Sequence, residues 1–139
     1  MRGRGRSARR ARGVAAGAAV LTVAAGLGMR TVADGAVAKY AGDALYTVLV
    51  CALVVLCAPR ARPFAVAGAG LGISWAVECF QLTGVPAELS ERSTVARLVL
   101  GSTFNAPDLL WYAVGAATAW AVCAAATSGA TAPRTAASR

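Results

Sequence analysis

The chain has 139 residues, of which 58% are hydrophobic and only 14% are charged, with a formal net charge of +8. A soluble domain usually carries about 25% charged residues, so this composition argues against one and predicts a membrane protein of one domain. The four cysteines form no Cys-x-x-Cys pair and the chain has no histidine, so we expect no metal and no cofactor.

The chain begins with a basic head, residues 1–13, which holds six of the fourteen Lys and Arg residues. Alternating arginine and glycine could indicate RNA binding. We favour a solvated cytoplasmic segment beside anionic lipid and expect no nucleic-acid partner. An apolar run over residues 14–29 follows and predicts a first transmembrane helix.

A secretory signal peptide is an alternative for the same region. A basic head, an apolar run and Ala-Val-Ala at 36–38 are together typical of a signal with a cleavage site. We favour a retained first helix, because the run is slightly long for a signal and Ala-x-Ala arises easily in an alanine-rich chain.

The second apolar run covers residues 44–58 and stops at Pro59. About 15 residues give roughly 22 Å of helix, which is less than the bilayer core of about 30 Å. We therefore expect this helix to begin earlier, at residues 40–43, which puts Asp43 at the membrane edge.

Two longer runs, residues 64–83 and residues 106–126, predict the third and fourth transmembrane helices. Asn105 followed by Asp108 resembles a capping box, so the fourth helix should begin at about Asn105. The polar tail, residues 127–139, should be disordered and cytoplasmic, which leaves residues 14–126 as the transmembrane domain.

Between the third and fourth runs lies a polar segment with a short helical pattern. Ser90 or Ser93 could cap this helix, and Gly101 would end it. Its apolar residues fall on one face, which predicts an amphipathic helix lying on the outer membrane surface.

The predicted fold is therefore all-α: a polytopic membrane helical bundle of four transmembrane helices plus one short amphipathic outer-surface helix. Ten Lys and Arg residues lie in the head, the turn after the second helix and the tail, against four in the other two loops. By the positive-inside rule we expect a multi-pass protein with both termini in the cytoplasm.

Polar residues converge at the opposite side of this predicted bundle. The candidates are Asp43, Glu78, Gln81, Arg97 and Asp108. An acid at the centre of a membrane helix costs about 2.5–3.5 kcal/mol on insertion scales, so it usually faces the bundle and pairs. We expect Arg97 to pair with Glu78 or Asp108. The alternative is that Asp43 and Asp108 only cap helix starts, where the helix dipole favours an anion.

Three motifs give the chain a family resemblance: Gly-Asp-Ala-Leu-Tyr at 42–46, Glu-Cys-Phe-Gln at 78–81 and Leu-Gly-Ser-Thr-Phe at 100–104. In their order they resemble the small bacterial membrane family DUF2809, a domain of unknown function, and more distantly the VanZ-like proteins. The resemblance implies four membrane helices with the first retained, and it supplies no reaction. VanZ-like proteins are linked to glycopeptide (teicoplanin) resistance, which implies a role in the cell envelope.

From these observations we predict an integral protein of the bacterial inner membrane, and we favour a binding protein over an enzyme. Its expected partners are the lipid bilayer and an envelope lipid or glycopeptide-like ligand at the outer polar cluster, with a homo-oligomer as a further option. One alternative is an intramembrane enzyme for a lipid-linked substrate, with Glu78 or Asp108 as general acid or base. Another is a purely structural subunit. No catalytic residue can be assigned from the sequence.

Overall fold

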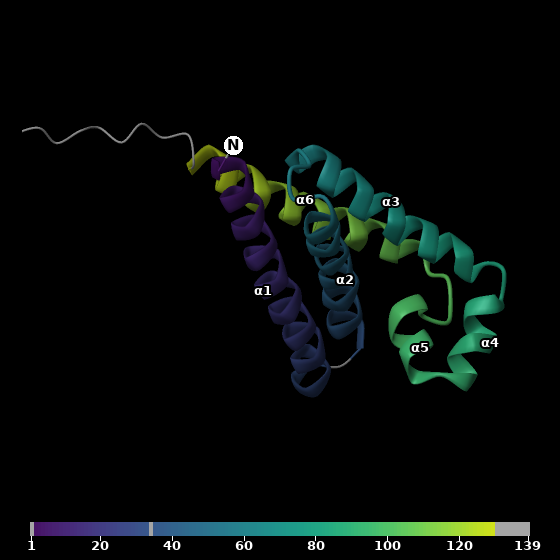
Figure 1. Cartoon of the computed structure of the whole chain (residues 1–139). Helices are drawn as coiled ribbons and strands as arrows, with labels where there is room; N and C mark the ends of the chain where they lie inside the picture. The colour runs from purple at the N-terminus through teal and green to yellow at the C-terminus, as the bar shows by residue number, and fades with distance from the viewer. Residues whose placement is uncertain (1, 34, 130–139) are drawn as a thin grey trace, which may run out of the picture.

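The computed structural model describes residues 2–33 and 35–129, which form six helices and no strand (Figure 1). The helices are α1 (Arg2–Val32), α2 (Gly35–Cys57), α3 (Pro63–Gln81), α4 (Val85–Arg92), α5 (Thr94–Leu100) and α6 (Ala106–Gly129). The all-α fold is thus confirmed. The prediction of disorder from residue 127 is wrong for residues 127–129, which are the last residues of α6, and the rest of that tail, residues 130–139, lies outside the described residues.

Four of these helices are long and apolar enough to cross a membrane. They are Gly5–Val32, Gly35–Cys57, Pro63–Gln81 and Ala106–Gly129. The shortest has 19 residues, or roughly 28 Å at 1.5 Å per residue, which matches a hydrocarbon core of about 30 Å. The chain is therefore a multi-pass membrane protein, as the apolar runs predict.

Two helix starts differ from the sequence expectation. The basic head is helical from Arg2 and continues into α1 without a break. The second helix begins at Gly35, whose φ of +66° favours glycine, and not at residues 40–43. Lys39 consequently lies within α2, one turn before Asp43, instead of in a loop.

The polar segment after α3 forms two helices where the sequence predicts one. Its break is at Ser93, whose extended backbone ends α4 and whose hydroxyl accepts a hydrogen bond from the backbone N–H of Ala96 at 3.3 Å. Ser93 is therefore the N-cap of α5, and Gly101 ends that helix with a φ of +66°, as the sequence predicts. The separate helix α4 was not predicted.

The helix α2 occupies the centre of the bundle and contacts α1, α3 and α6, while α3 also packs against α6 (Figure 1). Successive spans run in opposite directions. The start of α1, the turn at residues 58–62 and the end of α6 therefore lie together, and we call this the basic end. The start of α2, the end of α3 and the start of α6 lie at the other end, which we call the carboxylate end.

Two glycines allow the close approach of α2 to its neighbours. A Cβ added at Gly115 of α6 would lie 2.2 Å from the carbonyl oxygen of Ala44, and one at Gly70 of α3 would lie 2.3 Å from Sγ of Cys51. Between α2 and α3, the buried Thr47 hydroxyl donates to Ser74 at 3.0 Å. These contacts fix the spacing of the three helices that carry the polar residues of the carboxylate end.

We expect Gly115→Ala to lower the thermal stability of the detergent-solubilised protein. The added methyl meets backbone, which cannot rotate away, and overpacking of this kind costs about 1–3 kcal/mol. Gly72→Ala in α3 is the matched control, because a Cβ there meets nothing within 4 Å and alanine favours a helix by about 0.5–1 kcal/mol over glycine. Equal melting temperatures for the two variants would contradict the close approach.

Candidate functional site at the carboxylate end

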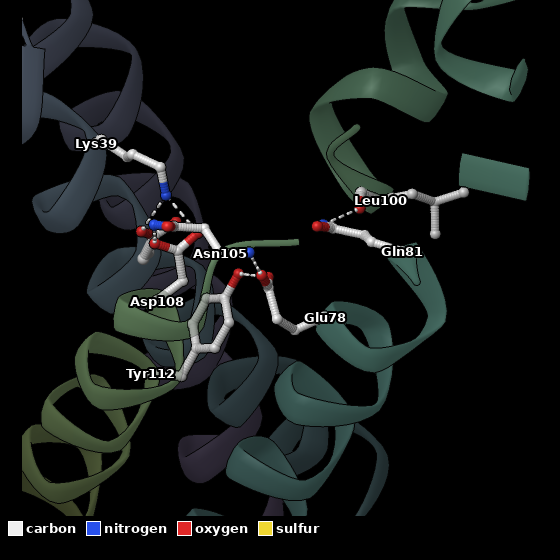
Figure 2. Close-up of polar contacts among 8 residues, drawn as sticks. Lys39, Glu78, Gln81, Leu100, Asn105, Asp108 and Tyr112 are labelled. Atoms are coloured by element: carbon white, nitrogen blue, oxygen red, sulfur yellow. Dashed lines mark hydrogen bonds and ion pairs between the residues drawn. The ribbon is translucent and has the colours of Figure 1, made fainter. Parts of the chain in front are cut away.

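Glu78, near the end of α3, is completely buried, and both of its carboxylate oxygens accept hydrogen bonds (Figure 2). The backbone N–H of Asn105 donates to Oε1 at 2.6 Å, and the hydroxyl of Tyr112 donates to Oε2 at 2.9 Å. Burying a carboxylate is costly unless such donors satisfy it. Glu78 therefore ties the end of α3 to the start of α6.

Asp108 in the first turn of α6 is also buried, with 4% of its surface exposed. One carboxylate oxygen accepts a hydrogen bond from the side-chain amide of Asn105, and the other pairs with the ammonium group of Lys39. The same ammonium lies 3.4 Å from Oδ2 of Asp43, one helical turn further along α2. A single cation from α2 is thus shared between two carboxylates.

Asn105 connects these two buried acids. Its backbone N–H donates to Glu78, its side chain donates to Asp108, and its carbonyl accepts from the backbone N–H of Asp108 at 2.9 Å. In a capping box the N-cap N–H would be accepted by the side chain three residues later. Here the N–H of Asn105 is accepted by Glu78 of α3 and not by Asp108. The predicted capping box between Asn105 and Asp108 is therefore wrong.

We call this connected set the carboxylate site. Its members are Lys39, Asp43, Glu78, Asn105, Asp108 and Tyr112. The site is closed toward the bundle and open at Lys39, whose side chain is 45% exposed, against 18% for Asp43 and 5% for Asp108. Access from outside the protein is therefore by way of Lys39 and Asp43.

Aromatic rings flank the open side of the carboxylate site. The rings of Tyr40 and Trp111 stack with centroids 5.3 Å apart, and the ammonium of Lys39 lies 5.7 Å from the centroid of Tyr40. An ammonium at this distance from an aromatic face is within the range of a cation–π interaction. The ammonium of Lys39 is thus surrounded by two carboxylates and a ring.

Gln81 is not part of the carboxylate site and points to a different neighbour (Figure 2). Its side-chain amide donates to the carbonyl of Leu100 at 2.7 Å, and a Cβ at Gly101 would lie 2.5 Å from that nitrogen. Its oxygen is buried without a hydrogen-bond partner among the described residues. The hydroxyl of Ser90 donates to the carbonyl of Gly101 at 2.9 Å. Gln81 therefore holds the end of α5 against α3.

Arg97 is exposed on α5, and the expectation that it pairs with Glu78 or Asp108 is wrong. Among the described residues, the ion pairs of the site join Lys39 to Asp43 and to Asp108. Glu78 is satisfied by neutral donors, so it has no need of a cation. Capping is also wrong for Asp43, which lies well inside α2, whereas Asp108 is in a first turn and combines the dipole position with an ion pair.

Three of the five candidates from the sequence thus meet in the structure: Asp43, Glu78 and Asp108. Three other members, Lys39, Asn105 and Tyr112, were not predicted. Spacing gave a signal for two of them, since Lys39 precedes Asp43 by four residues and Tyr112 follows Asp108 by four, which places each pair on one helix face.

The fold and the site together define a multi-pass helical membrane protein with a buried carboxylate pair at one end of its bundle. Residues 32–116 match the family described as "Protein of unknown function (DUF2809)". This match covers more than half of the chain, so the chain belongs to that family. It includes every residue of the carboxylate site. Searches among curated proteins and among solved structures found no match.

We expect Tyr112→Phe to destabilise the protein, because it removes the donor to Oε2 of Glu78 and leaves a buried carboxylate oxygen unsatisfied. The cost of such a change is about 1–3 kcal/mol, or more for a charged group. Tyr46→Phe is the control, since Tyr46 contacts the ring of Tyr112 but makes no hydrogen bond through its hydroxyl among the described residues. Thermal unfolding in detergent measures both; equal losses would argue against the Glu78 hydrogen bond.

Proposed function

We propose that this protein is a non-enzymatic binding protein of the bacterial inner membrane, which recognises the amine-bearing head group of an envelope lipid at the carboxylate end. Both termini would be cytoplasmic, with the basic segment 1–13 and the tail 127–139 on that side. The distribution of Lys and Arg along the sequence supports this orientation: ten lie in residues 1–13, 58–62 and 127–139, and four lie elsewhere.

The observation that carries the proposal is the ammonium of Lys39. It lies between Asp43 and Asp108 and beside the ring of Tyr40, yet its side chain is 45% exposed. Carboxylates and an aromatic face form an environment suited to an ammonium group. The site is therefore an ammonium site occupied by a long side chain of the protein itself, which can rotate toward solvent.

A zwitterionic lipid head group complements this arrangement. Its primary amine would take the place of the Lys39 ammonium beside Asp43 and Asp108, and its phosphate would bind the displaced lysine. With all three side chains ionised, the trio carries a net charge of −1, so a cationic group is favoured. A primary ammonium offers three N–H donors and a quaternary choline none, which provides a basis for selecting one lipid over the other.

Glu78 has a positioning role in this proposal. Both of its oxygens accept hydrogen bonds, from Asn105 and Tyr112, and its side chain is completely buried, so it does not face the open side of the site where a ligand would enter. It accepts a hydrogen bond from the backbone N–H of Asn105 and so fixes the position of that residue, whose side-chain amide donates to Asp108. These contacts support a binding site on a rigid frame more than the intramembrane enzyme considered from the sequence.

Lipid selectivity tests the proposal. Purified protein in nanodiscs or mixed micelles should retain phosphatidylethanolamine more tightly than phosphatidylcholine when bound lipid is measured by native mass spectrometry. Asp43→Asn should reduce this preference by about tenfold, which corresponds to a loss of about 1.4 kcal/mol, the scale of one charge-assisted hydrogen bond.

The matched control for Asp43→Asn is Glu91→Gln, which removes one carboxylate from the exposed surface of α4. It should leave the preference for phosphatidylethanolamine unchanged. Equal retention of the two lipids by the unaltered protein would exclude the amine-binding role. Retention without dependence on Asp43 would instead favour a structural subunit.

Reporter fusions test the orientation separately. Green fluorescent protein fused after Arg139 should fluoresce, and alkaline phosphatase at the same position should be inactive, because both results require a cytoplasmic C-terminus. Insertion of the phosphatase in the loop between α1 and α2 should give an active enzyme. The reverse pattern would place the carboxylate end in the cytoplasm and remove the envelope lipid from the proposal.

A further inference from the structure

A second polar feature lies at the basic end of the bundle, opposite the carboxylate site. A pocket of about 550 Å³ opens between the first turns of α1 and the turn that joins α2 to α3. Arg9 and Arg12 line it on the α1 side, and residues 57–61, with Arg60 among them, form the other wall. Segments that are about 50 residues apart in the sequence thus meet around one cavity.

The lining of this pocket is strongly positive. It contains the three arginines and no acidic residue. The helix α3 begins directly after the turn, at Pro63, and no side chain caps its N-terminus. The positive end of that helix dipole therefore adds to the charge of the arginines. Because the residues that line the pocket include arginines and no acid, its charge favours an anion.

Arg12, which lines the pocket, is hydrogen-bonded to α2. Its Nε donates a hydrogen bond to the carbonyl of Leu56 at 3.0 Å, in the last turn of α2. This bond uses one of the five N–H donors of the guanidinium and connects α1 to the C-terminal end of α2. Arg12 is exposed, and this one hydrogen bond restrains its planar guanidinium on the wall of the pocket.

The depth of the pocket in the membrane indicates which anions it meets. The candidate span Gly5–Val32 has 28 residues, or about 42 Å of helix, whereas a hydrocarbon core of about 30 Å needs only about 20 residues. If the apolar C-terminal part of this span crosses the core, about the first eight residues extend beyond it. Arg9 and Arg12 then lie in the head-group layer, where lipid phosphates are concentrated.

We propose that this pocket binds a phosphate group, and that its physiological source is the head group of an anionic phospholipid. The guanidinium of Arg12 and its neighbours Arg9 and Arg60 would contact the phosphate oxygens, which guanidinium groups recognise with paired N–H donors. The same chemistry would accept a soluble phosphate, so the experiment includes both sources. This site is independent of the amine-binding role of the carboxylate end.

A neighbouring pair of arginines gives the sharpest test. Arg9 and Arg10 are both exposed, but Arg9 lines the pocket and the adjacent Arg10 does not. Arg9→Gln and Arg10→Gln therefore remove the same charge at almost the same depth, and within residues 2–33 and 35–129 neither arginine makes an ion pair or side-chain hydrogen bond that folding would lose. Retention of phosphatidylglycerol by the full chain, measured by native mass spectrometry from mixed micelles, should fall about fivefold in Arg9→Gln.

Arg10→Gln should retain phosphatidylglycerol as the unaltered protein does. An equal loss of phosphatidylglycerol retention in the two variants would mean that the basic head attracts anionic lipid through its overall charge alone. This result would overturn the proposal of a phosphate site in the pocket. Sodium phosphate added at constant ionic strength identifies the source. Failure to displace phosphatidylglycerol at millimolar concentration supports the lipid head group, and displacement that Arg9→Gln weakens supports a soluble phosphate in the same pocket.

Discussion

The burial of one carboxylate, that of Glu78, determines how the carboxylate end is built. An ionisable group inside a membrane helix is expensive, so its oxygens require donors within the protein. Tyr112 and the backbone of Asn105 supply them, and both belong to α6 or to the residue just before it. The rotation of α6 and the path of the chain that enters it are therefore constrained by a residue on α3. Asn105 extends this constraint to Asp108, and through the lysine ion pair to α2.

Charged side chains of opposite sign are concentrated at opposite ends of this bundle. Arginines gather at the basic end around the pocket, while the buried acids lie at the carboxylate end with a single lysine among them. The apolar middle is joined by small residues and short contacts such as the approach of Gly115 to Ala44. Such a separation suits a bilayer, because polar side chains at both ends are near head groups and water while the centre stays apolar.

The sequence was sufficient for the features that depend on local composition or on topology. Apolar run length gave the four spans. Of the two cap candidates, Ser90 and Ser93, the structure uses Ser93, and Gly101 ends α5 as predicted. Antiparallel connection alone brought Asp43, Glu78 and Asp108 to one level. The hydrogen-bond and ion-pair partners of these acids were harder to predict, because they depend on how each helix is rotated about its axis. From charge alone, Arg97 was the expected partner of a buried acid. In the structure Glu78 is instead hydrogen-bonded by a hydroxyl and a backbone N–H, and Arg97 is exposed.

The family match separates the two proposed sites. Residues 32–116 contain the entire carboxylate site, together with α4 and α5. The pocket at the basic end combines Arg60, which lies inside the match, with Arg9 and Arg12, which precede it. The carboxylate site can therefore form within the part of the fold that defines the family, since its hydrogen bonds and ion pairs join only α2, α3, α6 and the residue before α6. The pocket, in contrast, requires α1 to extend past the membrane core with arginines at its start. A change in the first turns of α1 should affect the pocket while leaving the contacts of Glu78 and Asp108 intact.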